Sequence, residues 1–288
     1  MRAVIPFLTF AIFVACSSED KISDNHNDEE SIVTFTQFSA IVKDTFFINV
    51  QLPKGYSEDP ENPDRYPTVF LLDGNFYFPM MASTFRQYEI AGLLEPTIVV
   101  GISYKSFTEM DSLRVRDYLY PAALPSDEIN AAGGGNLFYD FLINELLPKI
   151  DAQYRTDKNN RALLGHSFGG YFVLYSLLNQ LNDKTSYFKK FISASPTLWY
   201  NNFYLNQLPQ QLDKNRERLG LFISVGQMED SIWSVNPLKY LTTEIRKRNL
   251  KGLQFKSRIY NHLDHMDVGV LSFTKGLQEL ASDKGKNP

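Results

Sequence analysis

The sequence predicts an α/β fold, with a mostly parallel central sheet, an antiparallel N-terminal edge and helices on both faces. Short, nearly continuous apolar runs alternate with helical patterns along most of the chain, which indicates strands buried on both faces and connected through helices. The first two strand-like segments instead show a partial apolar–polar alternation, as expected of an antiparallel edge. With 288 residues, 43% of them hydrophobic, the chain can form one large core.

The expected elements follow in a regular order. Two leading strands are expected at residues 32–38 and 41–52. The buried strands are expected at residues 68–72, 97–102, 161–164, 190–194, 219–225 and 255–260. Helical patterns cover residues 80–93, 136–152, 171–178, 238–248 and 268–280. Residues 104–135 are predicted to be irregular, and a segment of this length is usually a functional wall or lid.

The most informative stretch is residues 165–170, which read GHSFGG between an expected strand and an expected helix. Gly165 and Gly169 lack the Cβ atoms that would collide in a tight turn at this place. Such a turn lifts the Ser167 hydroxyl above the sheet edge and aims the next helix N-terminus at the place where an oxyanion would form. Ser167 is therefore the candidate nucleophile, and His166 is expected to be a core residue. Together with the element order, this is the layout of an α/β hydrolase.

A serine hydroxyl needs a base within hydrogen-bond reach and usually an acid that orients the base. In this fold the order along the chain is serine, acid, histidine. His265, just before the last expected helix, is favoured as the base over His262, which follows the same strand. The acid should follow the strand at residues 219–225, where Glu229 and Asp230 are both candidates.

An oxyanion hole needs two backbone N–H groups. One is expected from Phe168, the residue after the nucleophile. The other is expected from the loop after the strand at residues 68–72, where Asn75 is the chosen donor and Phe76 the near alternative.

These residues carry a resemblance to the putative-esterase family of α/β hydrolases, which includes siderophore trilactone esterases, S-formylglutathione hydrolase and the mycolyltransferases. The resemblance covers about residues 40–280 and includes the segments 69–74 (VFLLDG), 116–121 (RDYLYP), 138–156 and 195–199 (SPTLW). It implies Glu229 as the acid, through the family's Gly-x-x-Glu, although some similar siderophore esterases use a Ser-His dyad. It implies His265 through His-x-x-Val, where Met266 and Asp267 replace the usual small residues.

The resemblance implies a serine carboxylic-ester hydrolase that works through an acyl-enzyme without a cofactor. A siderophore trilactone is the expected substrate, and feruloyl or acetyl esters on plant polysaccharides, or acyl transfer, are the alternatives. Phe76, Arg116 and Trp199 are expected to shape the substrate pocket, with Arg116 equally suited to an ion pair with a carboxylate. A different class of function is a non-catalytic surface binding lipoprotein on a hydrolase scaffold, but such a scaffold would usually have lost the serine or the histidine.

The N-terminus predicts export. Residues 1–15 resemble a bacterial lipoprotein signal peptide, with a positive start, an apolar run too short to span a bilayer and a small residue before Cys16, the lipidation candidate. An ordinary secretory signal is the alternative. Residues 16–31 are polar and acidic and are expected to be a flexible tether, and residues 32–288 the catalytic domain. The expected location is a membrane-anchored lipoprotein in the periplasm or on the cell surface.

Composition excludes several other classes of protein. The net charge of -4 leaves no basic excess for nucleic-acid binding. Because Cys16 is the only cysteine, the mature domain has no thiol for a metal site or for a Cys-His mechanism. The pair His262 and His265 lacks a helical frame or a distant third ligand, so no metal is predicted.

Overall fold

The computed structural model describes residues 32–57, 59, 61–248 and 250–281. The signal peptide and tether predicted for residues 1–15 and 16–31 lie outside these residues. Eight strands form the sheet: β1 (Ile32–Ser39), β2 (Asp44–Gln51), β3 (Tyr66–Leu71), β4 (Ile98–Ser103), β5 (Thr156–His166), β6 (Lys190–Ala194), β7 (Leu219–Gly226) and β8 (Leu253–Tyr260).

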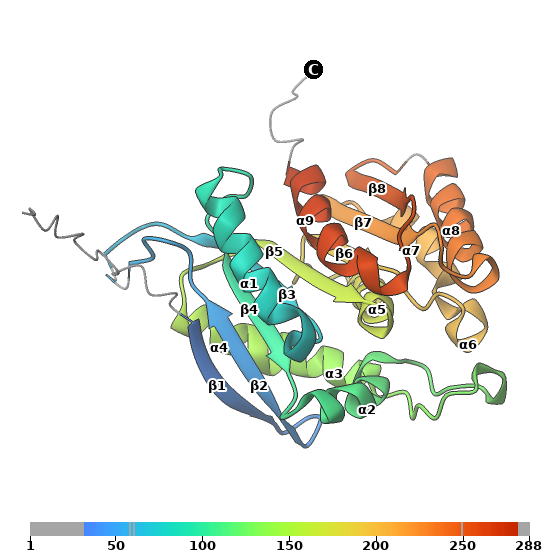
Figure 1. Cartoon of the computed structure of the whole chain (residues 1–288), viewed down its shortest axis with the longest axis horizontal. Coiled ribbons are helices and arrows are strands. Elements are labelled where there is room, and N and C mark those ends of the chain that lie inside the picture. Colours follow the sequence, from blue (N-terminus) through green and yellow to red (C-terminus); the bar gives the residue numbers. More distant parts are fainter. Residues whose placement is uncertain (1–31, 58, 60, 249, 282–288) are drawn as a thin grey trace, which may run out of the picture.

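The strand order across the sheet is β1-β2-β4-β3-β5-β6-β7-β8 (Figure 1). β1 pairs with β2, and β2 with β4, in antiparallel fashion, whereas all other neighbours are parallel. This confirms the predicted α/β fold with an antiparallel N-terminal edge. The alternation has its physical cause in β2, where buried and partly exposed residues alternate from Phe46 to Val50, whereas the edge strand β1 is mostly exposed.

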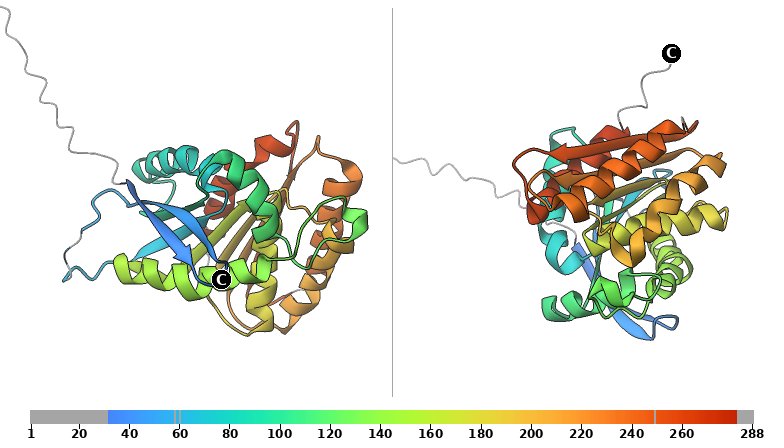
Figure 2. Two further views of the ribbon diagram at one scale, coloured as in Figure 1. Left: turned by 90° about the horizontal axis from the view of Figure 1, so that it is seen from below. Right: turned by 90° about the vertical axis from the view of Figure 1, so that its right-hand side faces the viewer.

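Helices cover both faces of the sheet (Figures 1 and 2). One apolar cluster packs α1 (Gly74–Ile90) and α9 (Val268–Ala281) on one face. The larger cluster lies on the other face and involves α2 (Phe107–Tyr118), α3 (Gly135–Phe141), α4 (Leu147–Gln153), α5 (Phe168–Asn182), α7 (Leu208–Lys214) and α8 (Asn236–Lys247). Within the described ranges, no helix combines the length and apolar character needed to cross a bilayer.

The register of the parallel strands positions the site. His166 at the end of β5 is paired with Ala194 of β6, and Ala194 is paired with Ser224 of β7. Because these strands end at the same edge of the sheet, the loops that follow them start side by side. The same edge carries the segment after β8, since Gly226 is paired with Tyr260.

The structure differs from the prediction at residues 104–135, where α2 and a short 3-10 turn at Pro125–Asp127 occupy much of the expected irregular segment. The Ser106 side chain caps α2 by accepting a hydrogen bond from the Glu109 N–H. Only three residues of α2 are buried, Met110, Asp117 and Tyr118. Because α2 buries so few residues, its sequence shows little helical periodicity of apolar residues, and no helix is predicted there. The helix predicted at residues 80–93 also begins earlier, at Gly74.

Candidate active site

A sharp turn at Ser167 joins β5 to α5. Ser167 has φ 60 and ψ -119, a conformation that L-residues rarely adopt and that costs strain energy. A Cβ atom on Gly165 would lie 2.4 Å from the Gly169 carbonyl oxygen, so glycine is required there. The Ser167 N–H donates to the Ala194 carbonyl at 3.0 Å, which ties the turn to β6. The chain thus has the strained strand–serine–helix geometry of a nucleophile elbow.

A histidine–carboxylate pair joins the loops after β7 and β8. His265 Nδ1 lies 2.9 Å from Glu229 Oε2. Burial by itself would raise the pKa of Glu229, but hydrogen bonds from His265, Ser195 and the Gly226 N–H outweigh it, and the pKa lies below its ordinary value. An ionised carboxylate only accepts, so the His265 proton sits on Nδ1 and Nε2 is left as an acceptor. This is the tautomer that a general base needs.

Asp230, the alternative acid, and His262, the alternative base, lie outside this histidine–carboxylate pair. Asp230 caps the short helical turn Ser231–Val235, where its carboxylate accepts hydrogen bonds from the N–H groups of Ile232 and Trp233 at 2.7 and 2.8 Å. His262 is exposed. The structure therefore pairs Glu229 with His265 and assigns Asp230 a helix-capping role.

His166 contacts the loop that carries His265. It is buried, with 3% of its surface exposed, as the sequence predicts for a core residue. Its Nε2 lies 2.8 Å from the His265 carbonyl oxygen, and a carbonyl can only accept, so Nε2 carries the proton. Burial, followed by the neighbouring His265, lowers the pKa of His166 to about 3. His166 is therefore neutral near pH 7 and holds the backbone of His265 in place.

The low pKa of His166 makes stability depend on pH. The unfolded chain binds a proton at this residue below pH 6.5, but the folded chain binds it only near pH 3. Since the unfolded state binds more protons in this window, the free energy of unfolding falls as the pH drops from 6.5 towards 3, by up to about 1.4 kcal/mol per pH unit. His166→Gln cannot titrate but can still donate to the His265 carbonyl. Urea unfolding across this window should show a shallower pH slope for His166→Gln, and equal slopes would contradict the assignment.

The segments that carry the two expected oxyanion donors lie against each other. A Cβ atom on Gly169 would be 3.0 Å from the Asp73 carboxylate, at the start of α1. The Phe76 N–H is already used by the Asp73 carbonyl at 2.9 Å. Asn75 is held in place through its side chain, which donates to the Tyr104 carbonyl at 2.9 Å and accepts from the Tyr104 N–H at 2.7 Å. Because the Phe76 N–H already has a partner, the backbone N–H of Asn75 is the better candidate for the second oxyanion donor.

Two arginines of α2 have different roles. The guanidinium of Arg116 forms ion pairs with Asp117 at 2.7 Å and with Asp44 at 2.8 Å. Of the two roles expected for Arg116, a wall of the substrate pocket or a partner in an ion pair, the structure shows the ion pair. Arg114 instead makes two hydrogen bonds to the Asp73 carboxylate, at 2.9 and 2.8 Å, and one to the His166 carbonyl at 3.1 Å. Arg114 was missed from the sequence because α2 itself was not predicted.

Aromatic side chains lie in the segments that follow β3, β4, β6 and β7. The chain has two tryptophans, and Trp199 meets Trp233 edge to face with ring centroids 6.2 Å apart. The ring centroids of Phe76 and Phe107 lie 6.1 Å apart. Trp233 is 51% exposed and Phe107 56%, so both offer apolar surface to a ligand. Trp233 was not predicted, although its position four residues after Glu229 was a usable signal.

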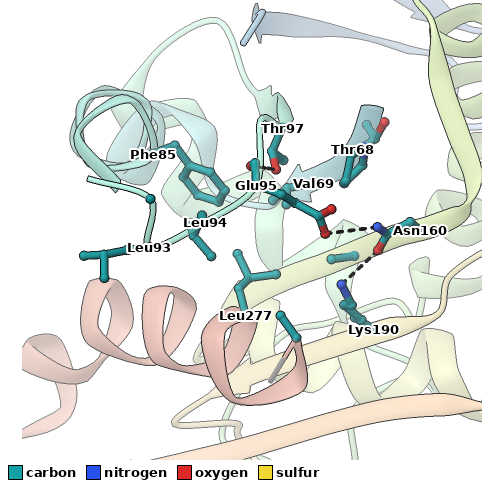
Figure 3. A pocket seen from close by; sticks show the side chains of 14 residues that line it. Thr68, Val69, Phe85, Leu93, Leu94, Glu95, Thr97, Asn160, Lys190 and Leu277 are labelled. Atoms are coloured by element: carbon teal, nitrogen blue, oxygen red, sulfur yellow. Dashed lines mark hydrogen bonds between the residues drawn. The ribbon is translucent and has the colours of Figure 1, made fainter. Parts of the chain in front are cut away.

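A hollow lies where the parallel strands begin, at the end of the sheet opposite the candidate catalytic residues and near the C-terminal ends of α1 and α9 (Figure 3). Its apolar lining includes Phe85 and Leu277, and a polar chain runs along one side, where Lys190 donates to Asn160 at 2.8 Å and Asn160 to Glu95 at 3.3 Å. It contains none of the candidate catalytic residues. Across the part of the chain that the structure describes, no group of three or more His, Cys, Asp or Glu side chains could hold a metal ion.

An eight-stranded sheet of this order, with a serine elbow after β5 and a histidine after β8, defines an α/β-hydrolase fold. Within that class, the chain belongs to the family described as "Putative esterase", whose model matches residues 39–280. This confirms the family that the sequence motifs indicated.

Among curated proteins, the chain is 32% identical over 185 residues to the ferri-bacillibactin esterase BesA of Bacillus subtilis, covering 59% of this chain and 62% of BesA. It is 32% identical over 141 residues to the apo-salmochelin esterase of Escherichia coli O6:H1, covering 46% of this chain and 42% of that protein. The matches thus span less than two thirds of the length of these relatives.

Solved structures show the same fold. The BES protein from Bacillus cereus superimposes with a TM-score of 0.76 at 22% identity, covering 96% of this chain and 99% of that one. An IroE-like serine hydrolase from Shewanella oneidensis gives a TM-score of 0.74 at 25% identity, covering 89% and 82%.

Proposed function

We propose that this protein is a serine carboxylic-ester hydrolase. The observation that carries the proposal is the pair of His265 and Glu229, which leaves His265 Nε2 as a hydrogen-bond acceptor on the sheet edge that also bears the Ser167 elbow. In the proposed mechanism His265 takes the Ser167 proton as the hydroxyl attacks the ester carbonyl. The backbone N–H groups of Phe168 and Asn75 stabilise the oxyanion.

The same groups complete acylation and then carry out deacylation. Protonated His265 gives its proton to the leaving alcohol, and the acyl group stays on Ser167. Water then attacks the acyl-enzyme while His265 takes its proton, and His265 passes that proton to Ser167 Oγ as the free acid leaves. Glu229 stabilises the imidazolium in both halves without taking its proton. If a second alcohol replaces water, the same machinery performs acyl transfer.

We further propose a siderophore ester, such as a trilactone, as the substrate. Two relatives carry names of siderophore esterases, for ferri-bacillibactin and apo-salmochelin. The exposed aromatic surfaces of Trp233 and Phe107 suit a ligand with aryl groups. A feruloyl or acetyl ester of a plant oligosaccharide would use the same catalytic chemistry and is the second candidate.

A panel of purified esters tests the substrate proposal. The protein is incubated with a siderophore trilactone, a feruloylated oligosaccharide, an acetylated oligosaccharide and p-nitrophenyl acetate, and the products are identified by mass. We expect the trilactone to be opened with the highest kcat/KM and a gain of one water in mass. Faster hydrolysis of a sugar ester would reassign the substrate, and turnover of none of them would favour a binding protein. A product joined to a second alcohol would indicate acyl transfer.

We also propose a lipid anchor at Cys16, supported by the sequence of residues 1–16. When the full chain is made in a bacterium, it should fractionate with membranes and carry acyl mass at an N-terminal cysteine. Cys16→Ser should release the protein or leave an unprocessed precursor. A chain beginning at Ile32 should keep full esterase activity, because the preceding polar segment has little to bury. Loss of activity in a folded chain of that kind would show that the segment does more than tether.

A further inference from the structure

Ser195 directly follows β6 and is one of the strained residues near the proposed catalytic groups. It has φ 42, in the left-handed region that favours glycine. It is 2% exposed, and its N–H donates to the Ser224 carbonyl at 2.7 Å. A buried residue held in this strained conformation directs attention to the contacts that its side chain makes.

The hydroxyl of Ser195 binds the carboxylate of the proposed triad. Ser195 Oγ donates to Glu229 Oε1 at 2.5 Å, and the Gly226 N–H donates to the same oxygen at 2.6 Å. The other oxygen, Oε2, accepts from His265 Nδ1. With Oε1 held by one donor from the end of β7 and one from the residue after β6, the carboxylate cannot rotate about its last bond without breaking both hydrogen bonds. Oε2 is thereby directed at the imidazole.

We propose that Ser195 is a positioning residue that orients Glu229 toward His265, an inference that rests on the proposed esterase mechanism. As His265 takes the Ser167 proton it becomes positively charged, and a carboxylate of fixed orientation stabilises that charge more than one that must reorient. In this proposal Ser195 acts through Glu229, because its hydroxyl donates to that carboxylate and its 2% exposure leaves almost no surface for the ester. Its effect should therefore fall on kcat and vanish when Glu229 is absent.

Kinetics of p-nitrophenyl acetate hydrolysis test this inference in Ser195→Ala and Ser195→Gly, alone and combined with Glu229→Ala. Glycine adopts φ 42 without strain, so Ser195→Gly removes the hydroxyl from a relaxed backbone. We expect each single variant to lose about 10-fold in kcat with KM within about twofold of the parent. In the Glu229→Ala background, the further loss should be under about twofold.

Ser224→Ala is the matched control, because it removes another buried hydroxyl, one that is 2.6 Å from Ser272 Oγ. It should keep the parent kcat. Parent-like kcat in Ser195→Gly, or an equal loss with and without Glu229, would overturn the inference. The parent and Ser167→Ala are measured alongside: if the parent hydrolyses no ester, the proposed function fails, and if Ser167→Ala keeps the parent activity, the proposed nucleophile fails. A dead Ser167→Ala with a parent-like Ser195→Gly refutes the role of Ser195 alone.

Discussion

Ser167→Ala is expected to lower ester turnover by about 10³-fold or more while the fold stays intact. The elbow holds Ser167 at φ 60 between β5 and α5, and the side chain of alanine is smaller than that of serine, so no new contact is forced. What remains after the loss of the hydroxyl is binding and any oxyanion contacts, which give only a small residual rate. Steady-state hydrolysis of p-nitrophenyl acetate measures the effect.

A fluorophosphonate probe gives an independent readout of the same residue. It should label the parent protein and leave Ser167→Ala unlabelled, because the probe reacts with an activated serine hydroxyl. Ser193→Ala is a matched control, since it deletes a buried hydroxyl that donates to the Gly170 carbonyl at 2.8 Å, and it should still be labelled. Labelling that persists in Ser167→Ala would assign the nucleophile to another residue.

His265→Ala is expected to cost about as much as Ser167→Ala, because nucleophile and base act as one unit. His262→Ala is the matched control. Its side chain is exposed and lies outside the pair with Glu229, so it should keep most of the activity. A large loss in His262→Ala with little loss in His265→Ala would exchange the two roles.

The acid is tested by a second matched pair. Glu229→Gln should lower kcat by roughly 10- to 10⁴-fold, because the amide cannot stabilise the imidazolium or hold its tautomer. Asp230→Asn should keep activity and cost at most about 1 kcal/mol of stability, since the carboxylate caps a helical turn. The reverse pattern would move the acid to Asp230, and little loss in both would favour a Ser-His dyad.

Much of the fold follows from local patterns. The strand predicted at residues 190–194 coincides with β6, and the run at 219–225 ends one residue before β7 does. These runs are apolar because both faces of the sheet are covered by helices, and strands buried on both faces are recognisable from sequence as continuous apolar runs. The antiparallel edge could be predicted as well, since β2 alternates buried and partly exposed residues and β1 is mostly exposed. Helix α2 could not, because it buries too few residues to show a period.

The sequence by itself determined the elbow, the candidate serine and histidine, and the family, since each depends on residues that are neighbours in the chain. The family motif favoured Glu229 over Asp230, but local chemistry left both open. The tertiary structure shows that the two neighbouring carboxylates have different partners. It also brought Arg114 to Asp73 and Ser195 to Glu229, pairs 41 and 34 residues apart. Hydrogen bonds act over about 3 Å. Which distant residues come that close depends on how α2 packs beside the end of β3 and on the register of β6 and β7, and no local pattern records either.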